Sequence, residues 1–261
     1  MRAMPPDAAS PGSRVSYPAA PNGYTIYLVG DIHGRVDLLA QVQERIDRDM
    51  ETHGVGRSAE VYLGDYIDRG PDSAGVIDRL IARATKVNSV FLRGNHEQLL
   101  LDFLDGADCF DFWRAVGGTA TLMSYGVDPG VVARSAPDDV RAGLNDKLPP
   151  EHRSFFEKTG SYTILGAYLA VHAGIRPLVP LERQQPVDLM GIRHLFLDHE
   201  ADFEFIVIHG HTPVREPEFR RNRINIDTGA FATGRLTCLR LGSDGVRLLG
   251  DGADGNLAPD T

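Results

Sequence analysis

Histidine, aspartate and asparagine recur beside glycine in five short segments of this sequence. The segments are GDIHG at 30–34, GDYIDRG at 64–70, RGNHE at 93–97, HAG at 172–174 and HGHT at 209–212. Imidazole nitrogens together with carboxylate and amide oxygens, without cysteine, are ligands that suit Mn, Fe or Zn in a catalytic site. Any one of these residues alone reads equally well as a turn or core residue. Five such segments in one chain favour a metal centre.

The order of the donors suggests how many ions such a centre holds. An Asp-x-His pair, a separate Asp and a separate Asn suit two divalent ions that lie about 3.5 to 4 Å apart and share one carboxylate. Glycine beside each donor lets the backbone turn sharply or approach a ligand closely.

The first three segments each follow an apolar run that is typical of a buried strand: Tyr24–Val29, Val61–Leu63 and Val90–Leu92. Between these runs, apolar residues recur at three- and four-residue steps from Leu38 onward and over Ser73–Lys86, which predicts amphipathic helices. Strands that alternate with helices predict a parallel βαβαβ unit, whose ligands lie beyond the carboxyl ends of the strands. The donor-bearing segments follow these ends.

The rest of the chain divides into a helical part and a β part. Residues 98–160 have a helical, loop-rich pattern, and we interpret them as a helical cap insertion. From residue 162 onward, runs such as YTILG, AYLAV, FEFIVI and RLTCLRL predict a mostly β half. We therefore expect an α/β fold with one domain over 23–249, a flexible arm over 1–22 and a flexible tail over 250–261.

Composition excludes several classes of protein. The formal net charge of −9 argues against a protein that coats nucleic acid by neutralising its phosphates. No apolar run approaches the roughly 18 to 20 residues of a membrane helix, so we expect no membrane partner. Two cysteines, Cys109 and Cys238, form no disulfide framework and fit a reduced compartment. These features predict a cytoplasmic protein, and they leave the oligomeric state open.

The five segments, in this order, resemble the phosphoprotein phosphatase family of binuclear metallophosphoesterases. The resemblance runs from about Tyr24 to about Leu249, and HTP at 211–213 with IDTGA at 226–230 resembles the short bacterial and bacteriophage lambda branch. It implies a central β-sandwich flanked by helices. It also implies two divalent metal ions per chain, with Mn as the expected ion and Fe, Zn or Mg as alternatives.

The resemblance also implies a ligand set. Asp31 and His33 would bind the first ion, Asp65 would bridge both ions, and Asn95, His172 and His211 would complete the second. The ions would lower the pKa of a bridging water, so that the resulting hydroxide attacks phosphorus directly. Many distant metallophosphoesterases have a second His after GHT, but Pro213 occupies that place here, so we expect water at the first ion instead.

Further residues would act on the substrate by the same resemblance. His96 would be the general acid that protonates the leaving oxygen, and Asp68 would orient its ring. Arg69, Arg93 and, by family position, Arg193 would bind the phosphate, because a guanidinium fork matches phosphate oxygens. We interpret His209, which precedes GHT, as a strand-end residue.

The function that this resemblance implies is metal-dependent hydrolysis of phosphomonoesters by a bacterial-type serine/threonine protein phosphatase, acting on a phosphorylated protein or a small phosphoester. The alternative is a symmetrical bis(5'-nucleosyl)-tetraphosphatase, a branch that usually has Ala in place of Asp68 and Asp in place of Glu97. A third hypothesis is a non-catalytic phosphate-recognition module. It would require a missing ligand or acid, and every one of these positions is filled.

Overall fold

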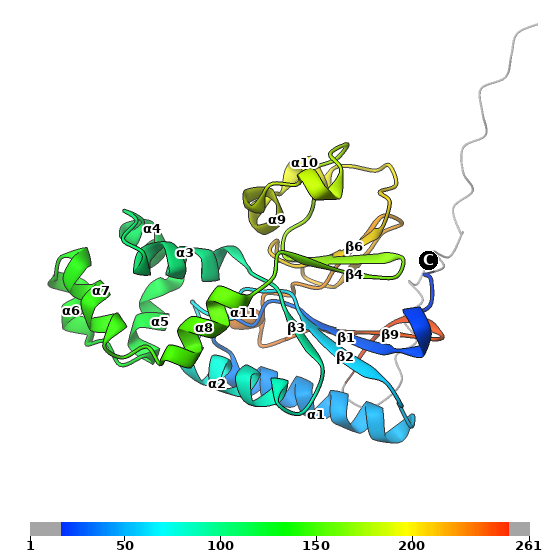
Figure 1. Cartoon of the computed structure of the whole chain (residues 1–261), viewed down its shortest axis with the longest axis horizontal. Helices are drawn as coiled ribbons and strands as arrows, with labels where there is room; N and C mark the ends of the chain where they lie inside the picture. The colour runs from blue at the N-terminus through cyan, green and yellow to red at the C-terminus, as the bar shows by residue number, and fades with distance from the viewer. Residues whose placement is uncertain (1–16, 251–261) are drawn as a thin grey trace, which may run out of the picture.

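The computed structural model describes residues 17–250 and shows two stacked sheets with helices on both sides (Figure 1). The first sheet contains β1 (Thr25–Val29), β2 (Ser58–Tyr62), β3 (Ser89–Phe91), β9 (Cys238–Gly242) and β10 (Gly245–Leu248) in the order β10-β9-β1-β2-β3. Strands β1, β2 and β3 are parallel, whereas β9 runs antiparallel to β1. The predicted βαβαβ unit is therefore confirmed.

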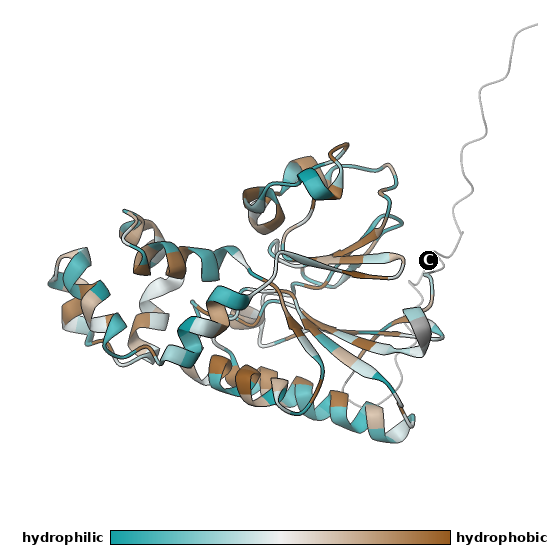
Figure 2. Cartoon of the chain, viewed as in Figure 1, coloured by the Kyte–Doolittle hydropathy of each residue, from teal (hydrophilic) through white to brown (hydrophobic). Residues whose placement is uncertain are grey.

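Two helices cover the outer face of this sheet. Helix α1 (Val36–Thr52) buries Leu38, Leu39 and Val42, and its polar residues alternate with this apolar stripe in Figure 2. Helix α2 (Ser73–Ala84) begins after Asp72, whose carboxylate accepts the Gly75 N–H at 2.8 Å. It ends two residues before the predicted Lys86. Both helices place the loops that follow β1 and β2 at one edge of the sheet.

The second sheet contains β4 (Tyr162–Leu165), β5 (Tyr168–Val171), β6 (Ile206–His209), β8 (Arg223–Asn225) and β7 (Glu218–Phe219), in that spatial order. Strands β5, β6 and β8 are parallel to one another. Apolar side chains of the two sheets pack face to face, among them Leu28 and Val61 against Ala170 and Ile208. This packing is the expected β-sandwich.

The C-terminal half is less purely β than its sequence predicts. Short helices follow the strands: η3 (Leu181–Arg183), α9 (Pro186–Gly191), α10 (His194–Leu197) and α11 (Ala230–Thr233). Leu189 of α9 and Phe196 of α10 pack on Leu169 and Val207, which lie on the outer face of the second sheet. Both faces of that sheet are thereby covered.

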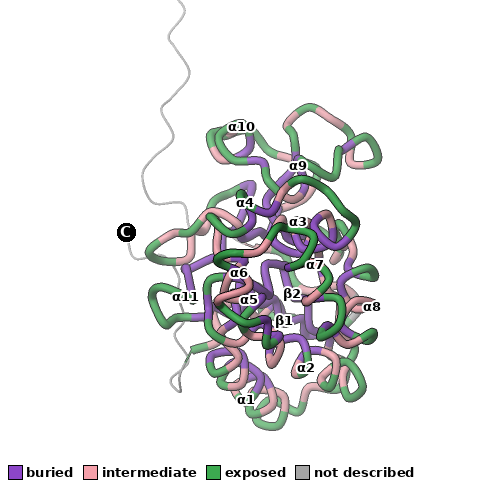
Figure 3. Tube along the Cα trace, turned by 90° about the vertical axis from the view of Figure 1, so that its left-hand side faces the viewer, coloured by how far each residue is buried: buried purple, intermediate pink, exposed green. Residues whose placement is uncertain are grey.

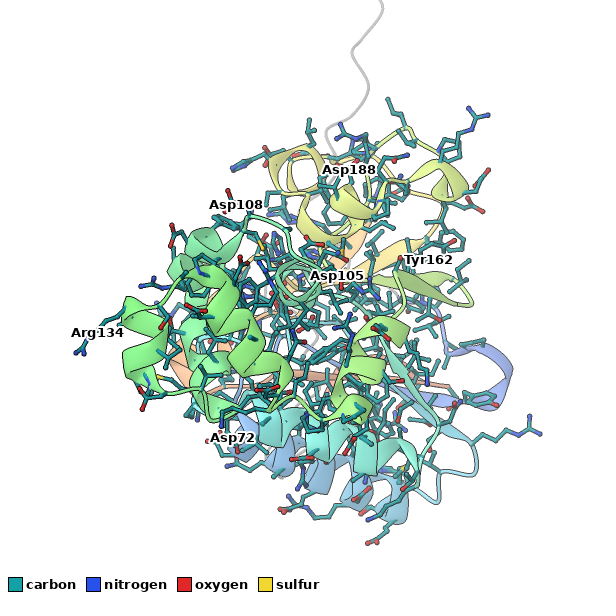
Figure 4. All side chains as sticks on the ribbon, turned by 60° about the vertical axis from the view of Figure 1, so that its left-hand side comes forward. Asp72, Asp105, Asp108, Arg134, Tyr162 and Asp188 are labelled. Atoms are coloured by element: carbon teal, nitrogen blue, oxygen red, sulfur yellow. The ribbon has the colours of Figure 1, made fainter. Side chains whose placement is uncertain are left out.

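The predicted helical cap is a bundle at one end of the sandwich. It contains α3 (Asn95–Leu104), α4 (Phe110–Trp113), the turn η2 (Arg114–Gly118), α5 (Thr119–Ser124), α6 (Pro129–Arg134), α7 (Pro137–Asn145) and α8 (Pro150–Lys158). Trp113 and Phe103 are fully buried and join the core that also lies under α1 and α2. The outer side is exposed in Figure 3, and Arg134 points away from the bundle in Figure 4. The cap and the sandwich therefore share one apolar core.

The predicted arm and tail lie largely outside the described residues. Within the described part of the arm, Tyr17 packs edge-on against Phe219, and the Ala20 N–H donates to the Gly242 carbonyl at 2.9 Å. The Tyr168 hydroxyl donates to the Pro18 carbonyl at 2.6 Å. Residues 17–20 thus pack on the sandwich, and η1 (Pro21–Gly23) leads into β1. Among residues 17–250, no helix has the length and apolar character needed to cross a bilayer.

Candidate metal centre

The candidate metal ligands converge where the carboxyl ends of both sheets meet. Two groups of side chains bring their donor atoms within 4.8 Å of one another, and Asp65 belongs to both. The groups are His33, Asp65 and His96, and Asp65, His172 and His211. Because parallel strands end at the same edge, residues that are far apart in the sequence meet here. The central position of Asp65 agrees with the bridging role that its sequence context implies.

Hydrogen bonds to backbone carbonyls orient the imidazoles of His33 and His172 toward Asp65. The His33 Nδ1 lies 2.8 Å from the Ile67 carbonyl, and the His172 Nδ1 lies 2.9 Å from the Leu63 carbonyl. A nitrogen that donates to a carbonyl must carry the proton, so the other ring nitrogen is left for a ligand. The Nε2 atoms lie 3.5 Å and 3.3 Å from the Asp65 carboxylate, respectively. Each ring, once its Nε2 carries no proton, is therefore the tautomer that a metal ligand needs.

Asp31 provides the test of whether an ion fits. Its Oδ2 accepts the His211 N–H at 3.0 Å, but its Oδ1 is buried without any hydrogen-bond partner. A buried oxygen without a partner is costly unless something else pairs with it. A Cβ at Gly210 would overlap this same Oδ1, so glycine keeps the space beside it open. This open, oxygen-lined position fits a divalent ion.

Asn95 joins the second group through His172. The Asn95 Oδ1 lies 3.2 Å from the His172 Nε2, and the Asp65 Oδ1 lies at 3.3 Å on the same nitrogen. The two groups thus contain four of the six predicted ligands. Asp31 and Asn95 belong to neither group and contact them through hydrogen bonds with His211 and His172. A set of carboxylates, imidazoles and one amide suits Mn, Fe or Zn, but it does not select one of them.

Burial and neighbouring charges set the protonation of these ligands. Burial lowers the pKa of His33 to about 3. Burial, together with the charge of His172, lowers the pKa of His211 to about 3. For His172, burial opposes the charge, but the Asp65 carboxylate raises its pKa to about 10. Burial and the Asp227 carboxylate raise the pKa of Asp31 well above its ordinary value. Without ions, His172 carries the cationic charge that balances Asp65.

His96 and Asp68 form a buried pair beside this cluster. The His96 Nδ1 lies 2.6 Å from the Asp68 Oδ2, and the His96 Nε2 lies 3.8 Å from the Asp65 Oδ2. Burial opposes the charged imidazole, but the carboxylates of Asp65 and Asp68 raise the pKa of His96. The ring is therefore held with Nε2 toward the cluster, as a proton donor to a bound group would be.

The three predicted phosphate-binding arginines have different surroundings. Arg69 donates to the Nε2 atoms of both His33 and His96, at 3.0 Å each, and its guanidinium lies 4.9 Å from the centre of the Phe231 ring. Arg193 is exposed, and its Nε donates to the His211 Nε2 at 3.2 Å. Both therefore lie at the edge of the ligand cluster.

Arg93 is bonded mainly to the cap, and its predicted role in phosphate binding stays a prediction. Its guanidinium donates to the Phe156 and Glu157 carbonyls at the end of α8, at 3.0 and 2.9 Å, and to the Thr159 hydroxyl at 2.8 Å. A further bond reaches the Gln98 side chain at 3.1 Å. A cation at a helix C-terminus pairs with carbonyls that lack intrahelical partners. Four of the five guanidinium N–H groups of Arg93 thus hold the cap, and one on Nη1 is left for a phosphate oxygen.

His209 lies at the end of β6, as its position before GHT predicts. It is fully buried, packs edge-on against Phe196 and belongs to neither ligand group. Burial lowers its pKa to about 3, so the ring is neutral.

Four residues near the site had no role in the sequence prediction. Glu97 is fully buried and accepts the N–H groups of Asp65 and Tyr66 at 2.8 Å each, which fixes the loop after β2. Asp227 follows β8, and burial raises its pKa to about 6. Trp113 and Thr121 of the cap bind Asp68. Glu97 and Asp227 had a usable signal, since each lies in a segment, RGNHE or IDTGA, that follows a strand.

Comparisons with known proteins agree with this geometry. The sequence model of the calcineurin-like phosphoesterase family matches residues 24–246. An asymmetrical bis(5'-nucleosyl)-tetraphosphatase, PrpE, of Anoxybacillus flavithermus is 28% identical over 82% of this chain and 89% of its own length. The PrpE of Bacillus thuringiensis is 27% identical with the same coverage.

Among the solved structures of similar fold is that of a candidate diadenosine tetraphosphatase. Its TM-score is 0.60 at 18% identity, and the match covers 89% of this chain and 97% of the other. The family match extends over both sheets, the cap and every predicted metal ligand. The chain belongs to the calcineurin-like phosphoesterase family.

Proposed function

We propose that the protein hydrolyses phosphate esters or anhydrides with two divalent ions, and that dinucleoside tetraphosphates, cleaved asymmetrically, are its first substrate class. The observation that carries the hydrolysis is the position of Asp65 in both ligand groups, beside the His96–Asp68 pair. The substrate class follows the PrpE relatives, which are named asymmetrical bis(5'-nucleosyl)-tetraphosphatases and match 82% of this chain. These names specify the asymmetrical reaction, not the symmetrical one considered from the sequence.

Two ions would be held by Asp31, His33 and Asp65, and by Asp65, Asn95, His172 and His211. When bound, they would supply Lewis acidity toward the phosphate and offset its charge. The protein's own contribution is to orient the phosphate and to move a proton. A proton on the His96 Nε2 replaces the bond from Arg69, so that Arg69 can turn to the phosphate oxygens.

A second candidate is the serine/threonine phosphatase activity that the sequence resemblance implies. The His96–Asp68 pair favours it, because an alkoxide leaving group is strongly basic and must be protonated as it departs. A nucleotide leaving group is a much weaker base and depends less on such an acid. The same pair can therefore serve both reactions, but it matters more for a phosphoprotein.

The deciding experiment compares diadenosine tetraphosphate with phosphoserine peptides in the presence of Mn, Mg, Zn or no added metal. We expect metal-dependent cleavage of the dinucleotide to AMP and ATP, and slower release of phosphate from the peptides. Two ADP products would show the symmetrical reaction, and faster peptide hydrolysis would favour the phosphatase. Failure of every substrate with every metal would favour a non-catalytic phosphate-binding module.

The His96→Asn variant tests the proposed acid. Asparagine cannot donate a proton from the position of Nε2, so kcat for a phosphoserine peptide should fall by about 10² or more. Cleavage of diadenosine tetraphosphate should fall less. Metal content, measured by elemental analysis, should stay close to that of the wild type, which separates loss of the acid from loss of ions. An unchanged kcat for the peptide would remove His96 from this role.

A further inference from the structure

The Asp68 carboxylate has partners beyond His96, and they come from the cap. Its Oδ2 accepts the Trp113 Nε1–H at 2.9 Å as well as the bond from His96, and its Oδ1 accepts the Thr121 hydroxyl at 2.6 Å. Asp68 and Thr121 are 0% exposed, and so is Trp113. Carboxylate oxygens that accept several N–H and O–H groups in the absence of water are fixed in position. The carboxylate therefore cannot rotate without breaking a bond to the cap.

The backbone at Asp68 and Arg69 is also held by the cap. Both residues are left-handed, with φ of 71° and 68°, a conformation that is strained for residues other than glycine. The Asp68 N–H donates to the Thr121 hydroxyl at 2.9 Å, and the Arg69 N–H donates to the Gly117 carbonyl at 3.2 Å. Such a conformation persists only where neighbouring groups impose it.

Gly117 shows how closely the cap approaches. Its φ is 121°, and a Cβ there would lie 2.7 Å from the Arg69 Cγ and 2.9 Å from the Arg69 N. Any side chain would push the turn η2 away from Arg69. The adjacent Val116 carbonyl accepts the Arg69 Nε–H at 3.3 Å. Segment 113–121 thus contacts both members of the Asp68–Arg69 pair.

We infer that Trp113 and Thr121 are positioning residues for proton transfer: they orient Asp68 so that it fixes the His96 ring with Nε2 toward the ligand cluster. The inference rests on the proposed acid role of His96. It gives the cap a part in catalysis, in addition to the substrate selection usually expected of an insertion. Each hydrogen bond leaves the carboxylate fewer orientations, and a lone pair of Oδ2 that Trp113 does not use faces His96 Nδ1.

The test uses substituted phenyl phosphates, which do not depend on the physiological substrate. Loss of a proton donor slows poor leaving groups more than good ones, so log kcat falls more steeply with the pKa of the leaving phenol. Thr121→Val removes the hydroxyl at nearly constant shape, and we expect kcat for phenyl phosphate to fall about tenfold with KM little changed. The loss for p-nitrophenyl phosphate should be smaller. Thr121→Ser keeps the hydroxyl and should restore the wild-type slope.

Trp113→Phe provides a second variant, because it removes the N–H and keeps an aromatic ring. Phe110→Leu is its control, since Phe110 stacks on Phe103 in the same core and makes no hydrogen bond to Asp68. We expect the steeper slope in Trp113→Phe and the wild-type slope in Phe110→Leu. Thermal unfolding verifies that each variant is folded.

Two outcomes distinguish a failure of the positioning role from a failure of the proposed acid role of His96. If His96→Asn steepens the slope but Thr121→Val and Trp113→Phe lower kcat equally for all phenyl phosphates, the positioning role is wrong. If His96→Asn itself leaves the slope unchanged, the acid role of His96 fails and the inference fails with it. A steeper slope in Phe110→Leu would also contradict the inference, because it would make the effect one of general packing.

Discussion

The charge of His172 depends on the neighbouring carboxylate of Asp65. Burial opposes its charge, but Asp65 raises its pKa to about 10, so without ions the imidazole is protonated at neutral pH. That proton lies among the His172 Nε2, the Asp65 Oδ1 and the Asn95 Oδ1. The same three atoms are the expected ligands of one ion. Proton and metal therefore compete for one position.

This competition predicts proton release on metal binding. A metal-binding imidazole must be neutral, so each ion bound by His172 releases one proton, and affinity should fall about tenfold per pH unit as pH is lowered from 9 to about 6. Calorimetric titration of Mn in buffers of different ionisation enthalpy measures the released protons. The His172→Asn variant should release fewer. Equal heats in all buffers would show that His172 is neutral before the ion binds.

At the scale of residues, the sequence predicts candidate metal ligands, but it does not predict the side chains that hydrogen-bond to the site residues and hold them in place. His33, Asp65, His172 and His211 lie within the ligand groups, because glycine-flanked donors after parallel strands meet at one edge. Asp31 and Asn95 lie beside these groups, on His211 and His172. Trp113 and Thr121 have no such signal, since a single indole or hydroxyl in a helical segment is most often a core or surface residue. For Arg93, the sequence does not predict most of its hydrogen-bond partners. Its sequence context fits phosphate, and tertiary structure directs it to α8.

At the scale of elements, the sequence predicts the long helix and the buried strands better than the short helices. The predicted β1, β2 and α1 agree with the structure to within a few residues, because their apolar periodicity is strong. The sequence pattern does not predict helices α9, α10 and α11. Segments of four to six residues contain fewer than two helical turns, which is too few for a periodic apolar pattern. Their positions depend on packing against the second sheet, and α10 begins directly after Arg193.

Replacing Arg93 tests its role at the scale of elements. Arg93→Met removes the bonds that connect the loop before α3 to the end of α8, so the free energy of unfolding should fall by about 1 to 3 kcal/mol. KM should remain unchanged. Arg193→Met should raise KM and leave the free energy of unfolding unchanged. The exposed Arg193 side chain contributes little to stability, but its Nε donates to the His211 Nε2. Urea unfolding and steady-state kinetics measure both; a raised KM with unchanged stability in Arg93→Met would return Arg93 to phosphate binding.

At the scale of the whole molecule, the candidate site joins the two sheets. Asp31, His33 and Asp65 follow strands of the first sheet, whereas His172 and His211 follow strands of the second. The expected β-sandwich follows from the family resemblance, and the strand pattern alone does not determine how two sheets stack. Ions that bind ligands from both sheets stabilise the folded state relative to an unfolded chain, in which these ligands are scattered.

Metal removal should therefore lower the stability of the entire domain. An ion at about 100 times its Kd adds about 2.7 kcal/mol, which for a domain of this size corresponds to a rise in Tm of roughly 5 to 10 °C. Scanning calorimetry of chelated and Mn-loaded protein measures this difference. Asp65→Asn loses the shared ligand and should show little change with Mn. A Tm that does not respond to metal in the wild type would contradict a centre that joins the sheets.

Trp113 is the only tryptophan in the 261 residues, and its indole N–H is bonded to Asp68. The intrinsic fluorescence of the protein is therefore an unlabelled optical signal from the carboxylate that holds His96. A change in the Asp68–Trp113 bond during substrate binding would alter the emission of this one ring, with no second indole to obscure it. Stopped-flow fluorescence of the unmodified chain can thus show whether this bond changes before, with or after product release.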